Sequence, residues 1–275
     1  MYFEYFGLRE APFAITPDTG FAFSSSSHQE ALNTLLVALQ CGEGFIKITG
    51  EVGTGKTLLC RKLLRTLNEE WVTAYLPNPC LDPGTLLLAL AEELQIADVE
   101  GLDQYHLLRR INMALLKLAR EGKQVALLID EAQAMPLTTL EVLRLVSNLE
   151  TEKRKLLQIV LFGQPELDQR LADPTVRQIR QRITFHHCLG GVARDELENY
   201  LNHRLRVAGY RGESMFSPRA LRSLYRASAG TPRLVNILAH KALLAVFGEG
   251  RQSVKARHIR RAALDTEGAK HPGWW

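Results

Sequence analysis

The sequence predicts an α/β fold in which a mostly parallel sheet is followed by a smaller helical domain. The segment Gly50–Thr57 follows a strand pattern, opens a helical pattern and matches G-x-x-x-x-G-K-[ST] in full. Val125–Ile129 is a continuous apolar run, as expected of a buried parallel strand, and two carboxylates follow it. Strand patterns alternate with helical patterns up to about Gly191, and only helical patterns follow.

The composition is that of an ordinary globular protein with a core of normal size. The chain has 275 residues, of which 46% are hydrophobic and 23% are charged. Cys41, Cys60, Cys80 and Cys188 form no C-x-x-C pair and have no histidines at zinc-finger spacing. We therefore expect reduced thiols, and neither a disulfide framework nor a zinc site.

The amino-terminal sequence is unlike a secretory signal. Glu4, Arg9 and Glu10 interrupt it before an apolar stretch forms. No run in the sequence approaches the ~18 apolar residues of a membrane-spanning helix. We expect a cytoplasmic protein that could still dock on a membrane protein.

Charge is distributed unevenly along the chain. Residues 1–176 hold 16 Lys and Arg against 23 Asp and Glu, whereas residues 177–261 hold 17 against 5. Opposite signs in two regions indicate head-to-tail contacts between subunits or an acidic partner. A solvated basic helical surface would give the same pattern.

The first 27 residues are rich in aromatic side chains and are expected to be irregular. Ser27 is expected to cap the first helix, with Glu30 completing a capping box, and Asp82 and Asp103 are the expected caps of two later helices. The expected strands are Gly44–Thr49, Val72–Leu76, Val125–Ile129, Leu156–Phe162 and Ile183–His187. The expected helices are Gln29–Gln40, Lys56–Leu67, Pro83–Leu94, Gln104–Arg120, Leu137–Leu149, Ala193–Ala208, Pro218–Ser228, Leu234–Phe247 and Ala256–Leu264.

The Gly50–Thr57 segment is expected to bind the phosphates of ATP. Its glycines let the backbone curl so that several N–H groups face one point, and the helix amino terminus adds positive potential there. Lys56 can reach the β- and γ-phosphates, and the Thr57 hydroxyl can ligate Mg²⁺. The predicted nucleotide contacts are Gly50, Glu51, Val52, Gly53, Thr54, Gly55, Lys56, Thr57 and Leu58.

The two carboxylates after the Val125–Ile129 strand are expected to serve hydrolysis. Asp130 can hold the Mg²⁺ shell across from Thr57, and Glu131 can orient and polarise the attacking water. A base at this position favours hydrolysis over binding alone. His28 and Gln29 are candidate neighbours of the adenine, because their helix precedes the strand that leads into the loop.

Further side chains could follow the γ-phosphate during its transfer. Gln164 follows the fourth strand and could hydrogen-bond the attacking water, and Arg233 opens a helix of the second domain and could swing onto the phosphates. Arg177, Arg180 and Arg182 precede the fifth strand and could act as arginine fingers in a neighbouring subunit.

With these residues the chain resembles the AAA+ ATPases of the ExeA/GspA group over nearly its whole length, and within that group it is most similar to the branch that serves MSHA-type type IV pilus biogenesis. The strings that carry the resemblance are Tyr5–Leu8, Pro12–Phe13, Thr16–Asp18, Gly42–Phe45, Thr49–Thr57, Leu128–Gln133, Phe162–Leu167, Arg180–Ile183 and Gly230–Asn236. The opening segment and the Phe162–Leu167 string are more specific than the phosphate-binding loop, which many families share.

The resemblance implies a five-stranded core of order 5-1-4-3-2 followed by a helical lid. It implies the sensor-1 role for Gln164, the sensor-2 role for Arg233, and the finger role for Arg182, with Arg180 next. We accordingly predict an N-terminal segment at residues 1–27, an AAA+ ATPase core at 28–191, a lid at 192–266 and a flexible tail at 267–275 that ends in Trp274 and Trp275.

The resemblance also implies ATP-dependent self-association into a ring or another head-to-tail oligomer, and an inner-membrane partner of a pilus or secretion system. ExeA continues into a transmembrane helix and a peptidoglycan-binding domain, and this sequence stops before either. We therefore expect a membrane-bound partner to supply the anchor, with the chain itself cytoplasmic and peripheral at the inner membrane.

Two other functions stay open. Transposition regulators of the TnsC type share this core and use ATP to polymerise on DNA, and the basic region 177–261 would suit phosphate contacts. Against a DNA partner, the sequence contains no zinc finger, no recognisable helix-turn-helix and no interleaving of aromatic and basic residues. A nucleotide-gated scaffold that scarcely hydrolyses ATP is the third possibility, and Glu131 argues against it.

Overall fold

The computed structural model describes residues 2–16, 18–150 and 154–270. Contacts divide the chain into two compact units. The sheet unit comprises residues 30–51 and 59–189, and the helical unit comprises the described residues of 1–29, 52–58 and 190–275. Pro17 of the Thr16–Asp18 string, and Trp274 and Trp275, lie outside the described residues.

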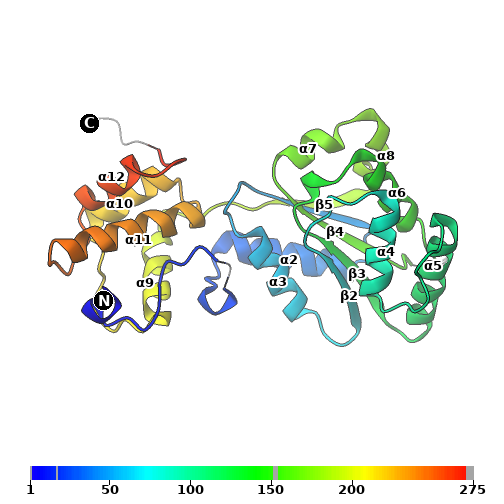
Figure 1. Cartoon of the computed structure of the whole chain (residues 1–275), viewed down its shortest axis with the longest axis horizontal. Coiled ribbons are helices and arrows are strands. Elements are labelled where there is room, and N and C mark those ends of the chain that lie inside the picture. The colour runs from blue at the N-terminus through cyan, green and yellow to red at the C-terminus, as the bar shows by residue number, and fades with distance from the viewer. Residues whose placement is uncertain (1, 17, 151–153, 271–275) are drawn as a thin grey trace. The chain divides into compact units, whose positions relative to one another are not determined.

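The sheet unit contains a five-stranded sheet whose paired strands all run parallel (Figure 1). Its strands are β1 (Phe45–Thr49), β2 (Trp71–Leu76), β3 (Gln124–Ile129), β4 (Gln158–Gly163) and β5 (Ile183–Cys188). Their spatial order is β2-β3-β4-β1-β5. This is the predicted order 5-1-4-3-2 read from the other edge, so the predicted fold class is confirmed.

Helices cover both faces of the sheet and form two apolar layers (Figure 1). The helices on one face are α2 (Ser26–Gln40) and α3 (Lys56–Thr66), and those on the other are α4 (Pro83–Glu93), α5 (Gln104–Arg120) and α6 (Leu137–Ser147). Along β1, Phe45 packs with the α4–α6 layer, whereas Ile46 and Ile48 pack with the α2–α3 layer. This alternation follows from the two-residue period of a strand, and it explains why both faces of the central strands are apolar.

The predicted caps of α4 and α5 are confirmed. The Asp82 carboxylate accepts from the N–H groups of Gly84 and Thr85, and the Asp103 carboxylate accepts from the N–H of His106. The predicted cap of α2 is wrong, because the helix begins at Ser26, three residues before the predicted start at Gln29, so Ser27 lies inside it. Ser25 Oγ takes the capping position and accepts from the N–H of His28 at 3.4 Å.

Two short helices and three 3-10 turns were missing from the sequence prediction, as was α1 (Tyr2–Phe6). The short helices are α7 (Glu166–Leu171) and α8 (Arg177–Arg180), and the turns are η1 (Thr19–Phe21), η2 (Ala132–Ala134) and η3 (Pro174–Val176). Each spans at most six residues. Segments of one or two turns are too short for a 3.6-residue apolar period to show in the sequence.

The helical unit is built on four helices, α9 (Leu197–Val207), α10 (Pro218–Ser228), α11 (Pro232–Gly248) and α12 (Ala256–Leu264). The aromatic N-terminal segment packs into their core, with Phe6, Phe13 and Phe21 all buried. Tyr5 of α1 lies edge-on against Phe247 of α11, with ring centroids 5.2 Å apart. Residues that the sequence analysis treated as irregular therefore belong to the core of the helical unit.

A buried arginine fastens the N-terminal segment to α9. Arg204 Nε donates to the Pro12 carbonyl at 2.7 Å, and the guanidinium lies 4.9 Å from the ring centroid of Phe21. Burial without partners would destabilise such a charge, so the carbonyl and the ring offset its desolvation.

At the other end of the chain, the start of the predicted flexible tail is packed: Ala269 is buried, and the Lys270 N–H donates to the Ala227 carbonyl at 2.8 Å.

Across residues 2–16, 18–150 and 154–270, none of the helices combines the length and the apolar character needed to span a bilayer.

Candidate nucleotide-binding site

The carboxyl ends of three neighbouring strands meet at one edge of the sheet. In the pairing of β1 with β4, Thr49 lies opposite Gly163, and the N–H of the next residue, Gly50, donates to the Gly163 carbonyl at 3.2 Å. Strand β3 lies on the other side of β4. The sheet thus places Gly50, Asp130 and Gln164 directly after adjacent strand ends, where parallel α/β sheets bind their ligands.

Within the helical unit, the loop that opens α3 has a backbone that only glycine adopts readily. Gly53 and Gly55 have φ values of +82° and +99°. A side chain at Gly53 would also collide with Arg233, whose Cβ lies 2.5 Å from the position that a Cβ at Gly53 would take. Arg233 N–H in turn donates to the Gly53 carbonyl at 3.2 Å, so the predicted sensor-2 residue touches the loop.

His28 lies against the same loop. Its Nε2 is 2.8 Å from the position that a Cβ at Gly55 would occupy, and its Nδ1 lies 2.8 Å from Ser25 Oγ. The capping serine of α2 therefore orients the His28 ring. The sequence analysis named His28 only as a neighbour of the adenine; its approach to the loop depends on tertiary packing that the spacing does not show.

The first turn of α3 carries Lys56, Thr57 and Leu58, and it contains no acidic side chain. Lys56 and Thr54 are buried, with 5% and 3% exposure. A helix amino terminus that holds a lysine and a hydroxyl and no carboxylate suits phosphate oxygens, because the N–H groups and the ammonium all favour negative charge.

In the sheet unit, Asp130 is buried, with 3% exposure, and lies near Tyr75 and Cys60. Burial, the nearby Cys60 and Asp130, and a hydrogen bond of the hydroxyl to Asp130 together raise the pKa of Tyr75 to about 12. Burial, and then Asp130, also raises the pKa of the Cys60 thiol. A buried carboxylate held by a neutral hydroxyl suits a hard cation that prefers oxygen ligands. The sequence did not indicate Tyr75 as a site residue, because a tyrosine within a strand pattern gives no sign that it lies beside Asp130.

Glu131, Gln133 and Gln164 form a closed hydrogen-bonded ring. Gln133 Nε2 donates to Glu131 Oε2 at 2.5 Å, and Gln164 Nε2 donates to the same oxygen at 3.0 Å. Gln133 Oε1 accepts from the backbone N–H of Gln164 at 2.9 Å. The ring links the predicted base to the predicted sensor, and Gln133 is a member that the sequence analysis quoted without giving it a role.

The backbone of Glu131 is in the left-handed region, with φ 51° and ψ 39°. This conformation is uncommon for a residue with a side chain, and such residues cluster at functional sites. Two amide donors hold Glu131 Oε2, which leaves Oε1 as the oxygen that can accept a hydrogen bond from a water molecule.

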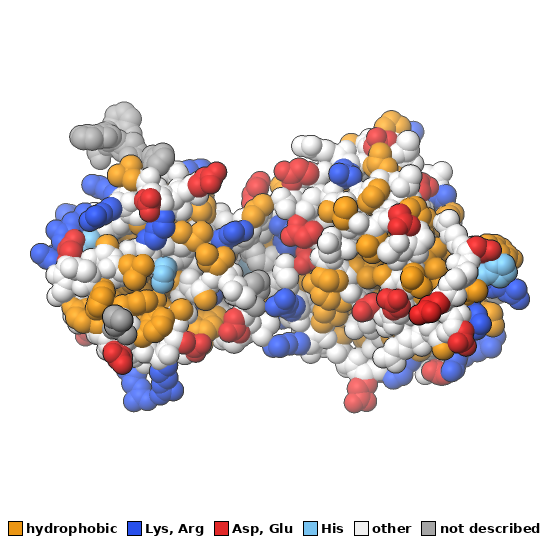
Figure 2. Space-filling view, viewed as in Figure 1, with side chains coloured by type: hydrophobic (Ala, Val, Ile, Leu, Met, Phe, Trp, Pro, Cys, Tyr) orange, Lys and Arg blue, Asp and Glu red, His pale blue; other side chains and the backbone are white. Residues whose placement is uncertain are grey.

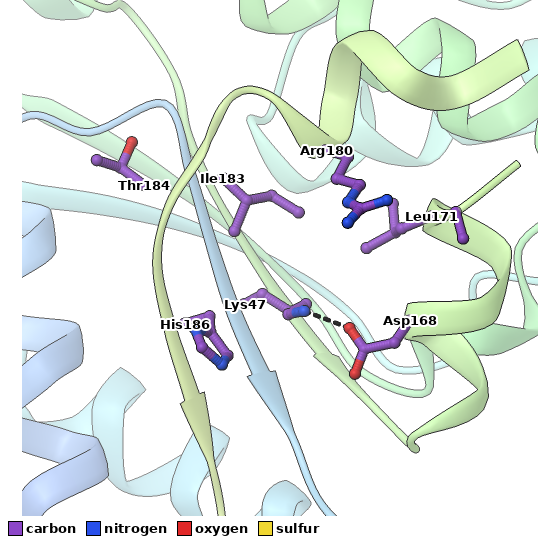
Figure 3. A pocket seen from close by; sticks show the side chains of 8 residues that line it. Lys47, Asp168, Leu171, Arg180, Ile183, Thr184 and His186 are labelled. Atoms are coloured by element: carbon purple, nitrogen blue, oxygen red, sulfur yellow. Dashed lines mark hydrogen bonds and ion pairs between the residues drawn. The ribbon is translucent and has the colours of Figure 1, made fainter. Parts of the chain in front are cut away.

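The three candidate finger arginines differ in their surroundings. Arg182 Nη1 donates to Ser147 Oγ at 2.9 Å and also to Asn148 Oδ1, so its guanidinium is engaged within the sheet unit. Arg177 and Arg180 are exposed on α8. Figure 3 shows Arg180 pointing into an open cavity of about 450 Å³, beside the ion pair of Lys47 with Asp168.

The residues fit a magnesium nucleotide better than a free metal ion. In the part of the chain that the structure describes, no three His, Cys, Asp or Glu side chains gather to hold a metal by themselves. Mg²⁺ in phosphoryl-transfer sites usually binds through one or two protein oxygens plus substrate phosphates. Thr57 in the helical unit and Asp130 in the sheet unit each carry an oxygen of the kind that Mg²⁺ prefers.

Comparison with known proteins gives the domain type. Residues 40–171 match the family described as AAA domain. The whole chain is 42% identical over 275 residues to General secretion pathway protein A of Aeromonas hydrophila, and it spans 50% of that protein's length. Residues 40–171 are therefore similar to an AAA domain, and the whole chain is similar in sequence to this secretion protein.

Solved structures with little sequence similarity share the fold. The ORC2 protein of Aeropyrum pernix, in ADPNP–ADP complexes, is 18% identical, with a TM-score of 0.65 over 93% of this chain and 73% of its own. Cdc6p of Pyrobaculum aerophilum is 17% identical, with a TM-score of 0.69 over 92% of this chain and 70% of its own. The RuvB Holliday junction branch migration motor of Thermotoga maritima is 16% identical, with a TM-score of 0.56 over 88% of this chain and 69% of its own.

Proposed function

We propose that the chain binds Mg²⁺·ATP and hydrolyses it as an AAA+ ATPase. The observation that supports this most strongly is the Glu131–Gln133–Gln164 ring at the carboxyl edge of the sheet, which leaves one oxygen of the Glu131 carboxylate to accept a hydrogen bond from water. Residues 28–191 form the ATPase core in this proposal, and residues 192–266 form its lid.

In the proposed reaction, Gly50–Leu58 cradle the phosphates and Lys56 offsets their charge. Thr57 and Asp130 would hold Mg²⁺, which neutralises charge on the phosphate oxygens when it is bound. Glu131 Oε1 accepts a hydrogen bond from the attacking water and orients it, while the Gln164 amide leaves Glu131 to contact the γ-phosphate. Arg233 contacts the phosphates from the lid.

Arg180 is our proposed finger, supplied in trans in a head-to-tail oligomer. The family resemblance favours Arg182 instead. However, the hydrogen bonds of Arg182 to Ser147 and Asn148 would have to break before it could reach another subunit. Arg180 is exposed, and no carboxylate among the described residues pairs with it.

We further propose that the ATPase assists assembly of a secretion or type IV pilus system from the cytoplasmic side, through an inner-membrane partner. The relationship to General secretion pathway protein A supports the secretion setting. The finer resemblance to the pilus-biogenesis protein MshM supports the pilus branch. A DNA partner is the competing proposal, since α10 and α12 expose several arginines.

Steady-state ATP turnover tests this function, measured with Mg²⁺, with excess EDTA, and with or without duplex DNA. We expect Mg²⁺-dependent turnover that DNA does not change and that Glu131→Gln lowers on the order of 100-fold. Strong stimulation by DNA would move the proposal to a DNA-bound regulator. Tight ATP binding without turnover, alone and at high protein concentration, would contradict hydrolysis and favour a nucleotide-gated scaffold.

A further inference from the structure

The outer face of α5 exposes two large apolar side chains within a set of cations. Tyr105 and Met113 are 70% and 58% exposed and lie eight residues apart, on the same side of the helix. The cations are Arg109, Arg110, Lys117 and Arg120, all of which are exposed. In Figure 2, orange, blue and pale blue side chains gather on the edge of the sheet unit where Figure 1 places α5.

Packing inside the unit does not account for these side chains. The inner face of α5, with Leu107, Ile111 and Leu115, supplies the contacts to the core. A helix of this kind normally places polar residues outward, so an exposed tyrosine and methionine on the polar side call for another partner.

The charged side chains within α5 itself are all basic, and the exposed Glu121 follows the helix directly. Gln104–Arg120 contains no Asp or Glu, and no described carboxylate forms an ion pair with Arg109, Arg110, Lys117 or Arg120. The flanking Asp103 caps the helix and pairs with His106.

We propose that the outer face of α5 binds the surface of a bilayer that contains anionic phospholipids. The arginines and Lys117 would contact headgroup phosphates, and Tyr105 and Met113 would enter the boundary between headgroups and acyl chains. In the proposed function, a membrane-bound partner attaches the chain to the membrane. The outer face of α5 would instead bind the lipid directly. Nucleotide hydrolysis is not needed for it, so its failure is separate from failure of the ATPase.

The chemistry of the face favours lipid over a protein or a nucleic acid. Protein interfaces also enrich Tyr, Met and Arg, but their centres are depleted of charge, whereas here four cations surround two apolar side chains. A duplex would engage the cations, but it offers no apolar environment for Met113 or Tyr105. Tyrosine is enriched where a bilayer meets water, because its ring is apolar and its hydroxyl is polar.

A second basic face in the helical unit provides a matched control. Arg219, Arg222 and Arg226 lie at i, i+3 and i+7 on α10, all exposed, and no described carboxylate pairs with them. None of the large exposed apolar residues of the described chain lies on α10. The two faces therefore share charge and differ in apolar exposure.

Co-sedimentation of the full chain with vesicles tests the proposal, using phosphatidylglycerol with phosphatidylethanolamine, or phosphatidylcholine alone. We expect binding only to the anionic vesicles. Binding to the anionic vesicles should weaken on the order of 100-fold in the triple variant Arg109→Gln, Arg110→Gln and Arg120→Gln, at about fivefold per arginine. Tyr105→Ser with Met113→Ser should weaken it about tenfold and, unlike the arginine effect, should persist in high salt.

The control is the triple variant Arg219→Gln, Arg222→Gln and Arg226→Gln, which should bind vesicles within about twofold of the unchanged chain, as a face outside the contact predicts. Equal losses in both triple variants would overturn the proposal in favour of general charge adsorption. Undiminished binding of the Tyr105→Ser, Met113→Ser variant would also overturn it. Loss of duplex DNA binding with intact vesicle binding in the α5 triple would assign the face to nucleic acid. If that triple does not fold, the Tyr105 and Met113 variant decides.

Discussion

The sheet unit and the helical unit carry different parts of the predicted ATP chemistry. The loop residues 52–58 group with the helical unit, together with Arg233 and His28. Asp130, Glu131, Gln133 and Gln164 all belong to the sheet unit. In the proposed reaction, the helical unit would supply Lys56 and most of the loop that holds phosphate, and the sheet unit would supply Gly50, Glu51 and the groups that act on water. Substitutions in the two units should therefore separate nucleotide affinity from turnover.

The largest effect is expected from the proposed finger. Arg180→Ala should lower kcat on the order of 1,000-fold and leave ATP affinity unchanged, because it acts on the charge that develops in a neighbouring subunit. Arg182→Ala is the matched control and should lower kcat much less. Mixing Arg180→Ala with Lys56→Ala subunits should restore part of the turnover. If Arg182→Ala shows the larger loss and is rescued by mixing, the finger is Arg182.

The second-largest effect on kcat is expected from the proposed base, Glu131. Glu131→Gln should lower kcat on the order of 100-fold while ATP binding, measured by fluorescence of a labelled nucleotide, stays intact. The amide can still bond to its neighbours but cannot accept a proton. A large loss of affinity in this variant would show that the sheet unit also holds the nucleotide, and the separation between the units would fail.

Substitution of Lys56 should have its main effect on ATP affinity, in contrast to the effect of Glu131→Gln on kcat. Lys56→Ala should weaken ATP affinity roughly 30-fold, since it removes charge-assisted hydrogen bonds to the phosphates. Arg233→Ala should act in the same direction and more weakly. Titration with the same labelled nucleotide measures both. Unchanged affinity in Lys56→Ala would contradict the role of the helical-unit loop.

The smallest effect is expected from Gln133. Gln133→Met removes both ring hydrogen bonds and should lower kcat about fivefold, with affinity and melting temperature unchanged. Gln133→Glu keeps the acceptor for Gln164 N–H but places a second carboxylate beside Glu131, so it should not restore turnover. A fall in melting temperature that parallels the loss of kcat would indicate a structural role instead.

The sequence was informative wherever short-range pattern decides structure. The strands, the Asp82 and Asp103 caps and the long helices follow from apolar period and capping chemistry, which are local. The strand order did not follow from pattern; it came from the family resemblance, and the structure confirms it. The roles of the site residues stay predictions.

Features that depend on competition between similar residues could not be predicted from sequence. Ser25, Ser26 and Ser27 are equivalent as caps by type, and Ser27 Oγ is used instead to accept from the N–H of Gly190 at 2.9 Å. The three arginines before β5 are likewise equivalent by type. Only the position of α6 shows that Arg182 has partners in Ser147 and Asn148.

The packing of Phe6, Phe13 and Phe21 among α9–α12 has a consequence for synthesis of the chain. All residues of the sheet unit have been added once residue 189 is made, but these rings wait for the helices that follow. At ~5–20 residues per second, the roughly 240 residues from Phe21 to the end of α12 take about 12 to 50 s to add. During this time, the first segment exposes aromatic surface that a chaperone could bind, and the helical unit can fold only after the sheet unit has been translated.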